Sequence, residues 1–179
     1  MKLSKETKQL IRKEYEEFKE SMYAGKSLEE RQELDQFFTP PEVSIKLIEE
    51  LSDLSGNVLD PTSGSGNLLA AALIAGADSD KIFGNDYDAT MVKLCRERLN
   101  KVCDILGKPH IQDWQIHQGN ALIPDCLTEF VPEYDNTILK ELLKRRNGLK
   151  GGWLANPEHY VAKGEVYQPD LFEDFFGGN

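Results

Sequence analysis

The chain has 179 residues, of which 40% are hydrophobic and 29% are charged, and its formal net charge at pH 7 is −10. This length permits one domain with a sizeable core. No run of about 18 apolar residues is present, which argues against a membrane span, and the charged N-terminus lacks the apolar segment of a secretion signal. The negative charge argues against a broad nucleic-acid-binding surface, although a local basic patch remains compatible with it.

Three cysteines, Cys95, Cys103 and Cys126, form an odd set without metal-ligand spacing. We expect them to be reduced thiols, and we expect no metal site. Free thiols are typical of reducing compartments, so the sequence predicts a cytoplasmic protein.

Residues 5–23 are predicted to form a helix, because apolar side chains recur there at three- and four-residue steps. We assign residues 1–34 to an N-terminal helical segment. The start of the helix is basic, and two interpretations are open. A solvated helix face is favoured, and an arm that touches nucleic-acid phosphates is the alternative. The basic residues are Lys2, Lys5, Lys8, Arg12 and Lys13.

A second helix is predicted over residues 40–51, directly after the run Phe37-Phe38-Thr39-Pro40-Pro41. Proline is favoured in the first turn of a helix, where the N–H that it lacks would have no partner. Thr39 is the predicted N-cap of this helix.

The next segment, residues 58–75, has the pattern of a strand, a tight glycine turn and a helix. Val58 and Leu59 lead into Asp60, a loop with Gly64 and Gly66 follows, and then a run of good helix formers. In an open α/β sheet such a junction faces the crevice where ligands bind. The loop lacks the P-loop lysine and the dinucleotide-binding spacing of glycines. An ordinary strand-to-helix turn is the alternative interpretation.

No basic residue lies between Asp53 and Lys81. The predicted site therefore suits a ligand whose reactive end is cationic or neutral, and S-adenosylmethionine, with an ammonium and a sulfonium group, fits this description.

Two further strands are predicted over residues 81–88 and 114–122, separated by a helix over 89–106. Asp86 ends the first of them, where nucleotide-binding α/β units carry the carboxylate that binds ribose hydroxyls. Asp88 is expected to cap the helix, and a capping role for both acids is the alternative. Asn120 follows the last strand, and its amide could contact a nucleobase.

Together these segments resemble amino-group DNA methyltransferases of the N6-adenine kind, which occur in restriction–modification systems and phages. The resemblance spans about residues 35–123 and implies a Rossmann-like sheet with flanking helices that binds S-adenosylmethionine. We assign residues 35–160 to this domain, with the family's later strands expected to be missing. The residues that the resemblance assigns to the cofactor are Phe38, Thr39, Pro40, Asp60, Pro61, Thr62, Gly64, Gly66, Asn67, Asp86, Tyr87, Asn120 and Ala121.

The sequence departs from the family at the catalytic tetrapeptide, which is Asn-Pro-Pro-aromatic or Asp-Pro-Pro-aromatic. The nearest candidate here is Asn156-Pro157-Glu158-His159-Tyr160, in which the second proline is missing. The resemblance implies that Asn156 and the Pro157 carbonyl bind the target amino group and that Tyr160 stacks on a flipped base.

Residues 161–179 form an acidic and aromatic tail. Within it, Gln168-Pro169-Asp170-Leu171-Phe172 resembles the short peptide with which bacterial replication proteins bind the sliding clamp. Alternatively, the apolar residues of the tail fold back onto the domain.

Two functions therefore compete at the level of sequence. The first is an adenine-specific DNA methyltransferase. The second is a catalytically inactive adaptor or subunit that binds a clamp or a second methyltransferase chain through its tail.

Overall fold

The computed structural model describes residues 1–23, 38–121, 126–127 and 130–131. Helices and strands alternate along most of this part of the chain, as a parallel α/β unit requires. The elements are α1 (Lys5–Tyr23), α3 (Pro41–Glu50), β1 (Val58–Asp60), α4 (Asn67–Ala75), the 3₁₀ turn η1 (Ser79–Lys81), β2 (Ile82–Asp86), α5 (Ala89–Leu106), the 3₁₀ turn η2 (Asp113–Gln115) and β3 (Ile116–Gln118).

The three described strands form a parallel sheet in the order β1-β2-β3. Val58 pairs with Ile82 and Gly84 pairs with Ile116, so the carboxyl ends of all three strands lie at one edge. The helix α4 packs on β1 and β2, α5 packs on β2 and β3, and the two helices contact each other. The α/β class predicted from the sequence is confirmed, and one face of the sheet is covered by α4 and α5.

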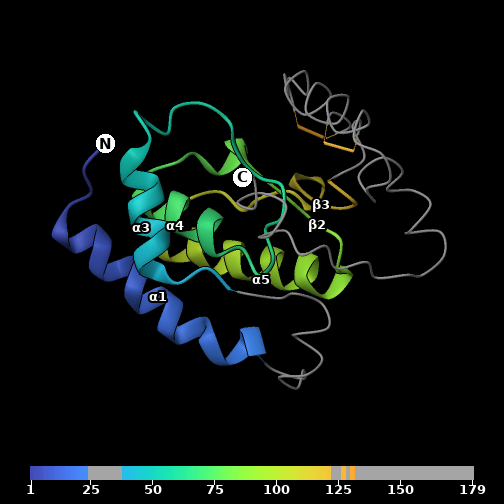
Figure 1. Ribbon diagram of the computed structural model, residues 1–179, viewed down its shortest axis with the longest axis horizontal. Helices are drawn as coiled ribbons and strands as arrows, with labels where there is room; N and C mark the ends of the chain where they lie inside the picture. The colour runs from blue at the N-terminus through green and yellow to red at the C-terminus, as the bar shows by residue number, and fades with distance from the viewer. Residues whose placement is uncertain (24–37, 122–125, 128–129, 132–179) are drawn as a thin grey trace, which may run out of the picture.

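The N-terminal helix α1 packs on α3, α4 and α5 and lies beside α3 in Figure 1. Its Ile11 belongs to the main core, together with residues of α4, α5, β2 and β3, and Val58 of β1 packs against this core. One turn further on, three of its residues, Tyr15, Phe18 and Met22, form a smaller cluster against which Phe38 is packed. The predicted helix over residues 5–23 is therefore confirmed, and its apolar stripe is buried.

The basic side chains of α1 face the acidic side chains of α3. Arg12 contacts both carboxylate oxygens of Glu42, at 2.6 and 3.1 Å. Lys8 contacts Glu49 at 2.7 Å. Both pairs are accessible to solvent, which screens them and limits their contribution to stability. In these pairs Lys8 and Arg12 bind carboxylates of α3, whereas the alternative interpretation of the basic start of α1 had them bind nucleic-acid phosphates.

Two local predictions were wrong. The N-cap of α3 is Pro40, not Thr39, and no side chain caps this end. A residue before a proline is pushed out of the helical region, and Pro40, which precedes Pro41, is extended with ψ 153°. The third strand begins at Ile116, because Trp114 lies in the η2 turn with 54% of its surface exposed.

Several predicted segments lie outside the described residues. They are the catalytic candidate at residues 156–160, the tail 161–179, and both proposed domain boundaries, after residues 34 and 160. Within the described residues, no helix is long and apolar enough to cross a membrane.

The glycine loop after β1 brings α4 and α5 into close contact. Gly66, which precedes α4, has a φ of +83°, in the left-handed region that favours glycine. A Cβ atom there would lie 2.7 Å from the Cys95 Sγ of α5. Gly64 also has a positive φ, +50°, but a Cβ atom at Gly64 would meet no neighbouring group within 4 Å. Gly66 is thus required for two independent reasons, conformation and space.

We expect Gly66→Ala to lower the free energy of unfolding by about 3 kcal/mol, since a left-handed residue costs about 1–2 kcal/mol and overpacking a further 1–3 kcal/mol. Gly64→Ala should cost only about 1 kcal/mol, from conformation alone. Urea unfolding measures both. In a Cys95→Ala background, the cost of Gly66→Ala should fall to that of Gly64→Ala. An unchanged cost in that background would mean that the contact with Cys95 does not matter.

Candidate functional site

Two carboxylates lie at the ends of neighbouring strands, with the glycine loop between them. Asp86 ends β2, and its two oxygens accept hydrogen bonds from the backbone N–H groups of Gly64, at 2.8 Å, and Asp88, at 2.9 Å. These bonds fix the orientation of the carboxylate. Because each carboxylate oxygen has two lone pairs, both oxygens can still accept one more hydrogen bond.

The second carboxylate, Asp60, ends β1 and is 8% exposed. Burial raises the pKa of Asp60, the negative charge of Asp86 raises it further, and a hydrogen bond from the Thr62 N–H at 3.1 Å partly opposes both effects. Ionisation of Asp60 therefore costs more than ionisation of a solvated aspartate, and an approaching positive charge would reduce this cost.

A buried amide joins the loops that follow β1 and β3. Asn85 is 1% exposed, and its Nδ2 donates to the carbonyl oxygens of Pro61, at 3.1 Å, and Gly119, at 2.9 Å. Its Oδ1 lies 3.1 Å from His117 Nδ1. All three strand ends are thus tied to one side chain.

The base of the glycine loop is also fixed from β2. Ser63 donates to the Asn85 carbonyl oxygen through its backbone N–H, at 2.8 Å, and through its hydroxyl, at 3.2 Å. Below the loop, burial raises the pKa of Cys95 to about 12. This thiol therefore stays neutral and acts as packing rather than as a nucleophile.

The segment Phe38-Thr39-Pro40-Pro41, hereafter the FTPP segment, is linked to this loop by one side chain. Asn67 Nδ2 donates to the Thr39 carbonyl oxygen at 3.0 Å, across 28 residues of sequence. Asn67 is buried, whereas Thr39 is half-buried. The FTPP segment and the glycine loop, which are distant in sequence, are therefore held together.

The structure gathers most of the predicted cofactor residues at this edge of the sheet. Asp60, Gly66 and Asn67 are buried, and Tyr87 is 62% exposed. The remaining members are half-buried or exposed: Phe38, Thr39, Gly64, Asp86, Asn120 and Ala121 are half-buried, and Pro40, Pro61 and Thr62 are exposed.

The predicted catalytic residues Asn156, Pro157 and Tyr160 lie outside the described residues, as does the clamp-like peptide 168–172. Among the residues that are described, no group of three or more His, Cys, Asp or Glu side chains could hold a metal ion.

Two residues important to the geometry were missed from the sequence. Asn85 lies in the strand predicted over residues 81–88, for which only the acidic residues were considered as functional. Arg98 is 1% exposed and lies in the apolar stripe of α5, between the buried Cys95 and Val102. A charge at such a position requires buried partners, and this signal could have identified it.

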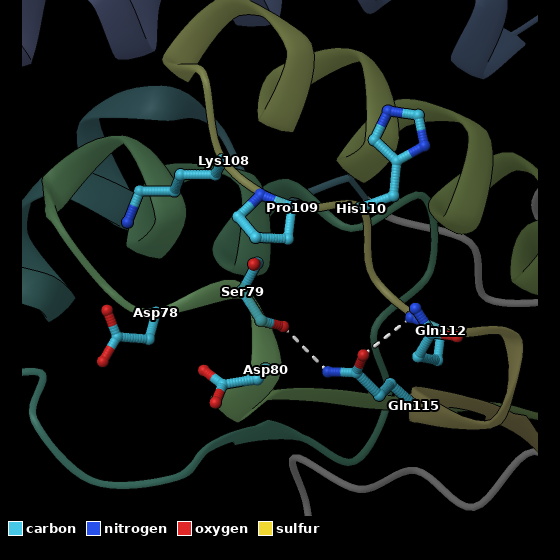
Figure 2. Close-up of a pocket in the computed structure, with 8 residues that line it drawn as sticks. All are labelled: Asp78, Ser79, Asp80, Lys108, Pro109, His110, Gln112 and Gln115. Atoms are coloured by element: carbon cyan, nitrogen blue, oxygen red, sulfur yellow. Dashed lines mark hydrogen bonds between the residues drawn. The ribbon is translucent and has the colours of Figure 1, made fainter.

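A pocket of about 470 Å³ is present at the opposite edge of the sheet, near the η1 and η2 turns (Figure 2). Gln115 closes one side, where its Nε2 donates to the Ser79 carbonyl oxygen at 2.8 Å and its Oε1 accepts from the Gln112 N–H at 2.7 Å. Lys108 donates to the Ala77 carbonyl oxygen at 2.6 Å. These polar groups already have protein partners, and the pocket lies at the amino ends of β2 and β3, away from the two carboxylates.

A parallel α/β unit with acidic strand ends around a glycine loop is an arrangement that occurs in nucleotide-binding α/β domains. A family model for N-6 DNA methylases matches residues 8–132, more than two thirds of the chain. The chain therefore belongs to the N-6 DNA methylase family. Comparison with curated proteins and with solved structures found no match in either.

Asn85→Asp should lower the free energy of unfolding by about 3 kcal/mol. The substitution removes both donors to the Pro61 and Gly119 carbonyl oxygens and turns a buried acid toward them, and a buried polar group left unsatisfied costs about 1–3 kcal/mol or more when it is charged. Gln118→Glu is the matched control, since it makes the same change at an exposed position on β3 and should alter stability by less than about 0.5 kcal/mol. Urea unfolding at neutral pH compares the two, and equal effects would mean that the Asn85 amide does not hold the loops.

Asp60→Asn should stabilise the ligand-free protein at neutral pH. Because the folded-state pKa of Asp60 is raised, its contribution to stability is full below the ordinary aspartate pKa and is lost as pH rises through the folded-state value. The advantage of the variant should therefore grow with pH over this window. The measurement is urea unfolding across a pH series.

The control is Asp53→Asn, which should shift stability in the opposite sense, since hydrogen bonds from Ser55 lower the pKa of Asp53. If both variants changed the free energy of unfolding in the same direction, the opposite pKa shifts of Asp60 and Asp53 would be contradicted.

Proposed function

We propose that this chain binds S-adenosylmethionine at the edge formed by Asp60, Gly64 and Asp86, and that it transfers a methyl group to adenine N6 in DNA. The observation that carries the proposal is the pair of carboxylates on adjacent strand ends, together with a stretch of sequence, residues 54–80, that contains no basic residue. Such a site repels phosphates and suits a cationic ligand.

Each chemical group of S-adenosylmethionine has a candidate partner among these residues. Burial and the charge of Asp86 raise the pKa of Asp60, and a cationic group such as the ammonium of the methionine end would offset both effects. The oriented oxygens of Asp86 match two vicinal ribose hydroxyls. Tyr87, 62% exposed beside Asp86, offers a ring face for the adenine, and Asn120 offers an amide for its edge.

The chemistry supplied by the bound cofactor is an electrophilic methyl group on sulfur. The protein's part is positioning, because in-line transfer needs the target nitrogen and the methyl group held close and aligned. Asn156 and the Pro157 carbonyl would accept hydrogen bonds from the target amino group, and Tyr160 would stack on the flipped base.

A Rossmann-like sheet would supply the geometry for these residues. Among the described strands, β1 is paired on one side only. A strand over residues 152–155, added in parallel beside β1, would end at the same edge as Asp60 and bring Asn156 to the cofactor.

The adaptor function stays as the competing hypothesis, because the catalytic tetrapeptide lacks its second proline. It shares cofactor binding with the methyltransferase hypothesis and differs from it in the absence of methyl transfer.

We expect calorimetry with the full chain to detect binding of S-adenosylmethionine. Asp86→Ala should weaken that binding by roughly 10- to 100-fold, the effect of losing hydrogen bonds to a charged group. Asp80→Ala, which changes an exposed aspartate at the opposite edge, is the control and should bind as wild type does. Absence of binding to the wild-type chain would overturn the proposal.

The second half of the experiment measures tritium transfer from labelled S-adenosylmethionine to unmethylated DNA. Transfer that disappears in Asn156→Ala would support the methyltransferase. Cofactor binding without any transfer would favour the adaptor.

A further inference from the structure

A buried ion pair connects α1 to α5 directly below the glycine loop. Arg98 of α5 is 1% exposed, and its Nε and Nη2 contact the two carboxylate oxygens of Glu14 at 2.7 and 2.6 Å. Glu14 itself is 8% exposed. The Phe18 ring covers the guanidinium at 4.9 Å. Both charges are thus removed from solvent and paired in a bidentate geometry.

The third guanidinium nitrogen of Arg98 is directed at the glycine loop. Nη1 donates to the Asn67 Oδ1 and lies 3.4 Å from the Ser65 carbonyl oxygen. Asn67 in turn donates to the Thr39 carbonyl oxygen at 3.0 Å. A continuous polar path therefore runs from Glu14 through Arg98 and Asn67 to the FTPP segment.

This path fixes which way the Asn67 amide points. A guanidinium has donors only, so the Asn67 oxygen must face Arg98 and its NH₂ group must face Thr39. A flipped amide would put two donors against Arg98 and two acceptors against each other at Thr39. Arg98 thereby determines the bond that holds the FTPP segment against the loop.

Stability alone is a weak reason for such a pair. Buried ion pairs are often replaced by well-packed apolar residues without loss of stability, because desolvation of two charges offsets their attraction. We infer that Glu14 and Arg98 are positioning residues for the proposed cofactor site, setting the separation of the glycine loop and the FTPP segment through Asn67. The inference rests on the proposed function, and it makes α1 part of the cofactor site.

The test replaces the pair by apolar side chains in the full chain, as Glu14→Leu with Arg98→Met. Urea unfolding should show that this double variant keeps most of its stability. Calorimetry should show that its Kd for S-adenosylmethionine rises about tenfold, the effect of one lost hydrogen bond. An unchanged Kd in the folded variant would overturn the inference.

The matched control is the other bidentate pair between α1 and a neighbouring helix, Arg12 with Glu42, which is exposed. Arg12→Met with Glu42→Gln removes this pair and should leave the Kd for S-adenosylmethionine at the wild-type value. A rise equal to that of the buried-pair variant would mean that any loosening of α1 weakens binding, and the specific role of Arg98 would be rejected.

Asn67→Ala tests the path itself. It should raise the Kd about as much as the double variant does, and combining the three substitutions should add little further, because they break the same connection. If the changes in binding free energy of Asn67→Ala and of the double variant added up, the two would act independently and the proposed path through Asn67 would be rejected. Should the double variant fail to fold, Arg98→Lys keeps the buried charge but lacks the fork that reaches Glu14 and Asn67 together, and the same rise in Kd is expected.

A measurement on the cofactor-free protein, the exchange rate of the Asn67 side-chain protons, tests this inference separately from the proposed function. In the wild-type chain, NMR should detect slowly exchanging Asn67 side-chain NH₂ protons, and their exchange should become fast in the Glu14→Leu, Arg98→Met variant. If the wild-type chain fails to bind S-adenosylmethionine, the proposed function falls, and with it the cofactor role of the pair. Unchanged exchange in the variant would independently refute the control of Asn67 by Arg98.

Discussion

The arrangement of the candidate site depends on the Asn85 side chain, a buried amide at the end of the central strand. Its two N–H groups reach the loop after β1 and the loop after β3, so the edges of the site cannot separate without leaving the donors of a buried amide unpaired. The backbone of the same residue holds Ser63 at the base of the glycine loop. A short sheet of three- and five-residue strands therefore presents the edge that carries the candidate site as one connected unit.

Much of the fold could be predicted because its signals are local. The α5 helix begins after Asp88, which accepts from the Thr90 N–H, and ends at Gly107, whose φ is +64°. Both signals act within a few residues of the boundary they set, and the same holds for the apolar spacing of α1. Strands ending at Asp60 and Asp86 were also predicted correctly, since an apolar run that turns acidic marks the point where a chain leaves the core.

The features that sequence reasoning missed depend on distant partners. Glu14 and Arg98 are 84 residues apart, and Asn85 contacts carbonyls 24 and 34 residues away. No spacing rule relates such positions, although a charge within an apolar helical stripe announces that some partner must exist. The N-cap of α3 was misplaced for another reason: the effect of Pro41 on the conformation of Pro40 outweighed the capping preference of Thr39.

The ion pairs between α1 and α3 bear on how DNA would bind under the proposed function. A protein gains salt-dependent affinity for DNA by bringing cations to phosphates and releasing the counterions condensed there. Lys8 and Arg12 already neutralise Glu49 and Glu42, so these two cations have little charge to exchange for counterions. A steep decline of DNA affinity with salt would have to originate at other cations, such as those in the basic run of residues 140–150. The slope of affinity against salt concentration thus reports which surface meets the phosphates.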